Sequence, residues 1–112
     1  MTKEFMYTSK FNHKWTKLGF DDDDLISLEL YLLENPTSGK IMEGTGGLRK
    51  LRWALPNRGK SGGVRILYVD YVFYEKICVL DLFAKNDKEN LSKTERVAIK
   101  NVIKAIGEEL RK

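Results

Sequence analysis

The chain has 112 residues, 12 of them aromatic, with 42% hydrophobic residues and a formal net charge of +4. This length favours a single domain over residues 1–112, and the composition excludes an intrinsically disordered chain. The single cysteine, Cys78, excludes an internal disulfide, and its apolar neighbours favour a reduced, buried thiol in a cytoplasmic protein. Because the sequence shows neither a signal-peptide pattern nor an apolar run of about 18 residues, we expect no membrane span.

The positive charge is concentrated in the middle of the chain. Residues 1–43 carry five basic and eight acidic residues, residues 69–112 carry nine and eight, and residues 44–68 carry six basic residues and no acid. Solubility alone does not require such segregation, whereas binding to a polyanion does benefit from a concentrated patch. The charge pattern therefore favours a polyanionic partner.

The N-terminal segment predicts a short strand followed by a helix. Residues 4–9 (EFMYTS) have the composition of a strand, and Ser9 is a candidate N-cap. Apolar residues then recur at i, i+4 and i+7, as Phe11, Trp15 and Leu18, and Gly19 follows as a stop.

A second helix is predicted from the four aspartates at 21–24 to Asn35-Pro36, with the apolar stripe Leu25, Leu28 and Leu32. Four consecutive carboxylates also raise the alternative of a metal site. Adjacent helical residues point in different directions, however, and acids in a first turn satisfy orphan amides and complement the helix dipole. We therefore interpret the run as a helix start.

The basic segment predicts strands. After a loop rich in Gly, Thr and Ser, the apolar residues Leu51, Trp53 and Leu55 alternate with Lys50, Arg52 and Ala54. The segment LPNRGKSGG is a long hairpin connection, and residues 64–74 (VRILYVDYVFY) are apolar at nearly every position, as in a central strand covered on both faces. Residues 76–84 (KICVLDLFA) predict a further strand.

The C-terminal segment predicts a helix. Ser92 and Glu95 form an S-x-x-E capping box, and the following apolar stripe consists of Ile99, Val102, Ile103, Ile106 and Leu110. The predicted order is β-α-α-β-β-β-α. We expect an α+β fold in which a small antiparallel sheet has its helices packed on one face.

Few residues have the chemistry of common catalytic sites. The one histidine, His13, falls on the polar side of the first helix, which disfavours a histidine-centred triad or metal site. The segment GTGGLRK lacks the spacing of a phosphate-binding P-loop and leads into a strand. What remains is a cluster of cations, in which Lys50 and Arg52 project together if their apolar neighbours face the core.

Arg65 is the most informative residue, because a charge in an apolar strand needs a partner or a function. One interpretation is an ion pair with Asp70 or Asp81. The other is that Arg65 binds a phosphodiester together with Lys50 and Arg52. Such a cluster of cations is sufficient for the cleavage of RNA, and no metal or cofactor is needed. The 2′-hydroxyl of the RNA is the nucleophile, and guanidinium groups stabilise the negative charge that develops on the phosphate oxygens. A lysine with a lowered pKa can protonate the leaving 5′ oxygen.

The segments GTGGLRKLRW, GKSGGVRILY and FAKNDKENLS, in this order, resemble the RelE/HigB toxins of bacterial type II toxin–antitoxin modules over nearly the whole chain. The resemblance implies a ribosome-dependent mRNA endonuclease that cuts A-site codons by 2′-hydroxyl attack and so inhibits translation. It also implies a HigA-like antitoxin with a helix-turn-helix as partner, beside the 70S ribosome and mRNA. Carried over by position, the catalytic candidates are Lys50, Arg52, Arg65 and Lys85, and the RNA- or ribosome-binding candidates are Arg49, Arg58, Lys60 and Lys88.

The sequence also departs from the family pattern. Several relatives use a C-terminal histidine or tyrosine to stack on a base or to move a proton, but residues 75–112 contain neither, and Phe83 is their only aromatic residue. The general base therefore stays unassigned. Two alternatives remain open: a gyrase inhibitor of the same fold, like the ParE branch, and an RNA- or ribosome-binding module without catalysis.

Overall fold

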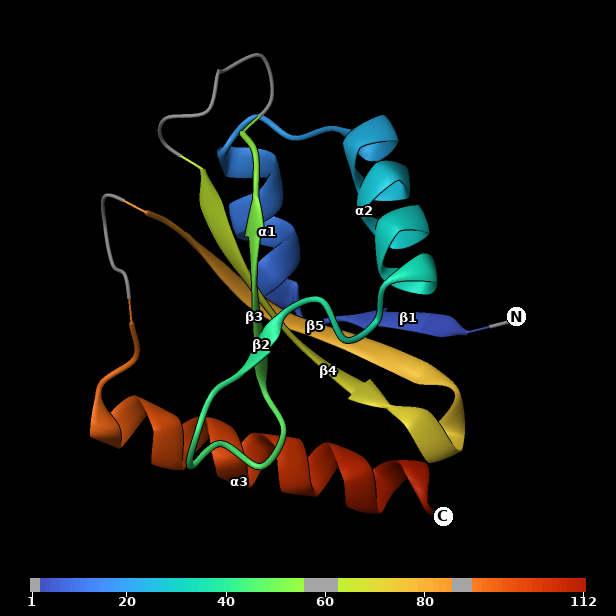
Figure 1. Cartoon of the computed structure of the whole chain (residues 1–112), viewed down its shortest axis with the longest axis vertical. Helices are drawn as coiled ribbons and strands as arrows, with labels where there is room; N and C mark the ends of the chain where they lie inside the picture. Colours follow the sequence, from blue (N-terminus) through green and yellow to red (C-terminus); the bar gives the residue numbers. More distant parts are fainter. Residues whose placement is uncertain (1–2, 56–62, 86–89) are drawn as a thin grey trace.

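The computed structural model describes residues 3–55, 63–85 and 90–112, which form a sheet with helices on both faces (Figure 1). The elements, in chain order, are β1 (Glu4–Tyr7), α1 (Ser9–Lys17), α2 (Asp22–Glu34), β2 (Lys40–Ile41), β3 (Arg49–Trp53), β4 (Val64–Tyr71), a 3₁₀ helix (Val72–Tyr74), β5 (Lys76–Ala84) and α3 (Lys93–Leu110). The predicted α+β class and order are confirmed, and the two-residue strand β2 is an addition. The longest helix in these ranges, α3, contains charged residues along its length, and none of the helices described is long and apolar enough to span a bilayer.

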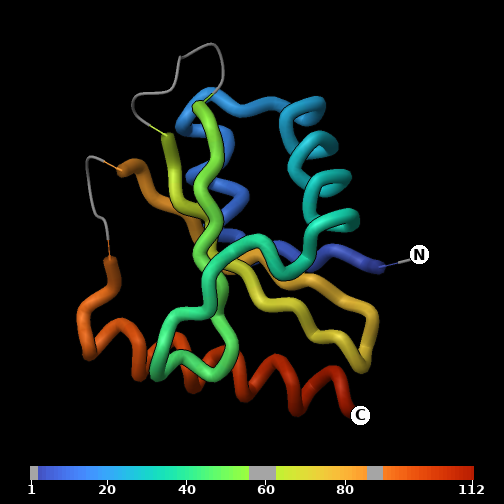
Figure 2. Tube along the Cα trace, viewed as in Figure 1, coloured from blue at the N-terminus to red at the C-terminus, as the bar shows by residue number. Residues whose placement is uncertain are grey.

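The sheet is mixed, which corrects the prediction of an antiparallel sheet. Its strand order is β1-β5-β4-β3-β2, and β1 runs parallel to β5 while the other neighbours are antiparallel. The pattern of a four-residue strand indicates burial but neither partner nor direction. In the structure, β1 runs in the same direction as β5, and the chain then passes directly into α1. This helix packs against the part of β5 that extends beyond β1 (Figure 2).

Helices cover both faces of the sheet, so the prediction that they pack on one face is wrong. Val64, Ile66 and Tyr68 of β4 pack in a core with α1 and α2, while Leu67 and Val69 pack in a second core under α3. A strand that is apolar at successive positions must be covered on both sides. The sequence of β4 therefore required the third helix to lie opposite the first two.

The helix ends follow local rules with two corrections. Ser92 and Glu95 form the predicted capping box at α3, and the predicted helix start at the aspartate run is confirmed, with Asp21 and Asp24 forming a reciprocal capping box there. The N-cap of α1 is Thr8 and not Ser9, since the Thr8 hydroxyl accepts the hydrogen bond from the helix backbone. Val102 is 46% exposed and does not belong to the buried stripe of α3.

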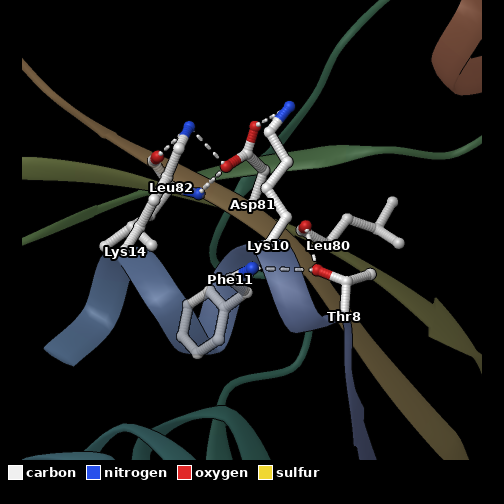
Figure 3. A network of polar contacts seen from close by, with 7 residues as sticks. All are labelled: Thr8, Lys10, Phe11, Lys14, Leu80, Asp81 and Leu82. Atoms are coloured by element: carbon white, nitrogen blue, oxygen red, sulfur yellow. Dashed lines mark hydrogen bonds and ion pairs between the residues drawn. The ribbon is translucent and has the colours of Figure 1, made fainter. Parts of the chain in front are cut away.

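The far half of β5 extends beyond β1, and α1 supplies the contacts there (Figure 3). The Thr8 hydroxyl donates to the Leu80 carbonyl at 2.6 Å, and Lys14 Nζ donates to the Leu82 carbonyl at 3.3 Å. Lys14 also pairs with Asp81 at 2.9 Å. These contacts fix the segment of β5 that leads to Lys85.

Tyr68 fastens the connection between α2 and β2 to the centre of the sheet. Its hydroxyl donates to the Pro36 carbonyl at 2.8 Å and accepts from the Gly39 amide at 3.1 Å. Burial raises the pKa of Tyr68, which keeps the hydroxyl protonated as this donor. A Cβ at position 39 would lie 2.9 Å from the Tyr68 ring, so only glycine permits this approach. The contact sets the position of Lys40, the next residue.

Candidate functional site

Cationic side chains converge where β3 and β5 end and β4 begins, at the end of the sheet that α3 does not reach (Figure 1). In the ladder, Arg52 lies opposite Arg65, and Arg65 lies opposite Phe83. The Lys85 amide donates to the Gly63 carbonyl at 3.0 Å, which holds the end of β5 against the start of β4. Three strands thus bring together residues that are 33 positions apart in the sequence, from Arg52 to Lys85.

These residues line two adjoining depressions, which we name together the cationic cleft. One is lined by Arg52, Trp53, Ala54, Gly63, Arg65 and Lys85. The other, of about 580 Å³, is lined by Tyr31, Ser38, Lys40, Lys50, Leu51, Arg52 and Arg65. Arg52 and Arg65 belong to both, so the surface is continuous. Among the described residues that line it, five carry a positive charge and none is acidic.

The two arginines occupy different depths. Arg65 is only 3% exposed and lines both depressions, so it forms their floor, whereas Arg52 is exposed at the rim. The two acids that the sequence offered as partners for Arg65 are engaged by lysines. Asp70 pairs with Lys3 at 2.9 Å, and Asp81 pairs with Lys14 at 2.9 Å.

Lys40 is a cleft residue that the sequence analysis missed. It lies directly opposite Lys50 in the β2–β3 register, and cross-strand partners share one face of a sheet. The segment before β3 was interpreted as a loop, because a two-residue strand leaves no periodic signal. The segment Thr37-Ser38-Gly39 before Lys40 carries no sequence signal of strand pairing.

Gly63 shapes the floor of the cleft. A Cβ at this position would lie 2.9 Å from the Trp53 carbonyl oxygen, so a side chain would force β3 and β4 apart at this point. The strands approach closely just where Arg52 and Arg65 stand opposite each other. This gives one of the glycines of the basic segment a specific structural role.

The structure does not bring the other predicted site residues into the described part of the cleft. Arg49 is not brought to the cleft: its guanidinium donates to the carbonyls of Gly39 at 2.7 Å and Thr37 at 3.2 Å. Arg58, Lys60 and Lys88 lie outside the described residues. Arg49 therefore stabilises the connection that carries Lys40, and the described part of the cleft consists of Lys40, Lys50, Arg52, Arg65 and Lys85.

Other groups with catalytic chemistry are absent from the described lining of the cleft or inert. His13 is exposed on α1, as predicted. Cys78 is buried in β5, and burial raises the pKa of its thiol to about 11, so it stays protonated at neutral pH. The described ranges contain no group of three or more His, Cys, Asp or Glu side chains placed to hold a metal ion.

Comparison with known proteins agrees with this architecture. Among the solved structures that resemble the chain are an arginine double mutant of the Escherichia coli toxin RelE in the free state and the intact E. coli RelBE toxin–antitoxin complex. The first has a TM-score of 0.57 at 16% identity over 93% of this chain and 98% of RelE. The second has a TM-score of 0.53 at 15% identity over 72% and 94%. At such identities, these structures show a shared fold.

The family model for the RelE toxin of the RelE/RelB toxin–antitoxin system matches residues 6–111. The match begins within β1, covers β2 to β5 in full and reaches past the last residue of α3, and it includes every described residue of the cationic cleft. This chain belongs to the RelE toxin family of toxin–antitoxin systems.

Proposed function

We propose that this protein is a ribosome-dependent mRNA endonuclease that cleaves A-site codons by attack of the 2′-hydroxyl and inhibits translation in the cytoplasm. The observation that supports it is the cationic cleft, where the lining residues described include five cations and no acid. Membership of the RelE family supports the same activity. The described lining of the cleft supplies positive charge to a phosphodiester and contains no carboxylate.

The mechanism follows from the depths of the cations. In this mechanism Arg65 on the floor and Arg52 at the rim bind the two non-bridging oxygens, which gain negative charge in the transition state; their shared depression supports this role. Their guanidinium groups stay charged throughout the physiological pH range. Lys85 lies beside them in one depression and Lys50 in the other, so either lysine can protonate the leaving 5′ oxygen. The attacking 2′-hydroxyl comes from the RNA itself: its oxygen forms the new bond to phosphorus as the bond to the 5′ oxygen breaks, and its proton passes to water.

The ribosome and an antitoxin are the partners we propose. The cleft binds phosphate, but the in-line geometry of the 2′-hydroxyl depends on how the mRNA is held, which the ribosome would supply. Arg58, Lys60 and Lys88 would then contact RNA. The similarity to RelE in the RelBE complex supports an antitoxin that binds this chain, and the sequence resemblance favours a HigA-like protein with a helix-turn-helix.

The test is a primer-extension map of a defined mRNA in a purified translation system with and without ribosomes. We expect cuts at A-site codons only with ribosomes present. Arg52→Ala, a change at an exposed position, should lower the cleavage rate about 100-fold or more, because it removes one charged hydrogen-bonding group from the transition state. Arg65→Lys keeps a buried charge but loses the bidentate fork, and we expect a similar loss.

Lys104→Ala is the matched control, since it removes an exposed cation from α3 at a distance from the cleft. Its cleavage rate should equal that of the wild type. If the wild type leaves mRNA intact and instead inhibits supercoiling by purified gyrase, the proposal is wrong. If it binds ribosomes with strong salt dependence but produces no cut ends, the cleft is a binding surface only.

A further inference from the structure

We infer that Tyr31, backed by Trp53, is a base-stacking residue that holds the nucleobase beside the scissile phosphate and contributes to the choice of cleavage site. The inference rests on the proposed RNA cleavage. It assigns an aromatic function to a residue of α2, in a chain whose residues 75–112 contain no tyrosine or histidine.

Tyr31 reaches the cleft from a different layer of the fold. It lies near the C-terminal end of α2, which packs on the opposite face of the sheet from α3. Among the described strands, β2, two residues long, is the one that flanks β3 on this side, and its pairing stops at Lys50. At Leu51 and Arg52 the edge of β3 is therefore open, and the depression that Tyr31 lines passes over it to Lys50 and Arg65.

The ring of Tyr31 is positioned by a second aromatic residue. Its centroid lies 5.4 Å from that of Trp53, with the planes inclined at 59°, a tilted pair of the favourable edge-to-face kind. Trp53 lines the other depression of the cleft. Each depression that holds Arg52 and Arg65 thus has an aromatic wall, and the two walls touch.

Exposure alone does not distinguish Tyr31, because α2 also exposes Ile26 and Leu30 more strongly, at 53% and 59%. Tyr31 is 37% exposed, and unlike those two residues it lines the depression with Lys40, Lys50 and Arg52. An aromatic face beside cations is the arrangement that binds single-stranded nucleic acid: cations hold the phosphates, and bases stack on the rings. The cluster therefore fits an unpaired nucleotide and not a lone anion.

The test compares Tyr31→Phe, which keeps the ring, with Tyr31→Leu, which removes it. Leu30→Ala is the matched control, because Leu30 is the adjacent exposed residue outside the depression. In the ribosome assay over a set of A-site codons, we expect Tyr31→Phe to cleave within about threefold of the wild type. We expect Tyr31→Leu to lower the cleavage rate about 5- to 150-fold and to alter the codon preference. This range corresponds to the loss of one base-stacking interaction.

A binding measurement separates this inference from the proposed function. At low salt, the free protein is titrated with an uncleavable 2′-O-methyl trinucleotide and with its abasic counterpart, following Trp53 fluorescence in a Trp15→Phe background. The base-containing probe should bind about 5- to 150-fold more tightly than the abasic probe. This ratio of affinities should fall toward one in Tyr31→Leu but not in Tyr31→Phe or Leu30→Ala.

Three results decide between the proposals. A wild-type ratio of one overturns the stacking inference without any variant. Cleavage that requires Arg52 but is indifferent to Tyr31→Leu overturns it as well, while the endonuclease proposal stands. A wild type that cuts no mRNA, yet shows a base-dependent ratio lost in Tyr31→Leu, removes the endonuclease proposal and keeps Tyr31 as a base-binding residue.

Discussion

The two ends of the sheet use the same strands in opposite ways. At one end, α3 covers a core that includes Met42, Leu48, Val69, Cys78 and Ile103, which we call the packed end. At the other end, the same strands extend beyond α3 and carry the residues of the cationic cleft. Apolar burial favours folding at the packed end, while clustered like charges at the cleft oppose it.

The polar groups at the two ends differ in the same manner. At the packed end the buried Thr45 hydroxyl donates to the Met42 carbonyl at 2.5 Å and accepts from the Leu48 amide at 3.1 Å. That group is neutral. At the cleft, the buried polar residue is the charged Arg65. The difference indicates that apolar burial at the packed end offsets the destabilising effect of the clustered charges at the cleft. Mutations at the packed end should therefore change stability, and mutations at the cleft should change activity.

The largest effect on stability should come from the packed end. Ile103→Ala removes a side chain that is 5% exposed and leaves a cavity under α3, which should lower the free energy of unfolding by about 2–4 kcal/mol. Urea unfolding followed by circular dichroism measures this loss. Cleavage per folded molecule should be unchanged, and a loss of activity without a loss of stability would contradict the division between the two ends.

Alkaline pH should destabilise the packed end through two buried groups. Burial raises the pKa of Tyr71 to about 12 and that of Cys78 to about 11, above ordinary values of 10.0 and 9.0. Both groups are neutral when folded, so their contribution to stability is complete below pH 9. It is lost as pH rises through about 9–11 for Cys78 and about 10–12 for Tyr71, because the unfolded chain ionises first. Each group contributes a slope of at most about 1.4 kcal/mol per pH unit.

Urea midpoints measured from pH 8 to pH 12 test this expectation. Cys78→Ala should flatten the decline that starts near pH 9, and Tyr71→Phe the decline that starts near pH 10. Tyr71→Phe should also lower stability slightly at neutral pH, because its hydroxyl donates to the Ile103 carbonyl at 2.7 Å. An unchanged alkaline slope in both variants would show that these groups do not ionise on unfolding.

Local features of the fold were predictable because their causes are local. The capping boxes of Asp21 and Ser92 and the end of α1 near Gly19 depend on neighbours within four residues. The cover of both faces was also implicit in the apolar run of β4, although the expected single helical layer ignored it. The parallel direction of β1 was not predictable, since it depends on β5, about 70 residues later.

The candidate site shows the same limit. Period-two alternation in β3 predicts Lys50 and Arg52 on one face, as the structure has them. Arg49, predicted to bind RNA, instead donates to loop carbonyls. Lys40 and Tyr31 could not be found in this way, because one arrives through a two-residue strand and the other across an open sheet edge. Alternation predicts neighbours along a strand, not residues that tertiary packing delivers.

The smallest effects should arise where α1 supports the strand that carries Lys85. Thr8→Val keeps the shape of the side chain but removes the oxygen that caps α1 and bonds the Leu80 carbonyl, so we expect a loss of about 1 kcal/mol in the free energy of unfolding. Lys10→Ala is the control, since Lys10 is largely exposed, pairs with Asp81 at 3.3 Å, and should cost less than about 0.5 kcal/mol.

The same pair of variants tests whether support at the far half of β5 matters for the cleft. Loss of the Thr8 bond should speed amide hydrogen exchange at Leu82 and Ala84 and lower cleavage a few-fold through Lys85, because a fraying strand no longer holds that lysine beside Arg65. Exchange and cleavage should both stay at wild-type values in Lys10→Ala. Faster exchange with unchanged cleavage in Thr8→Val would instead show that Lys85 acts from a position that β5 does not need to fix.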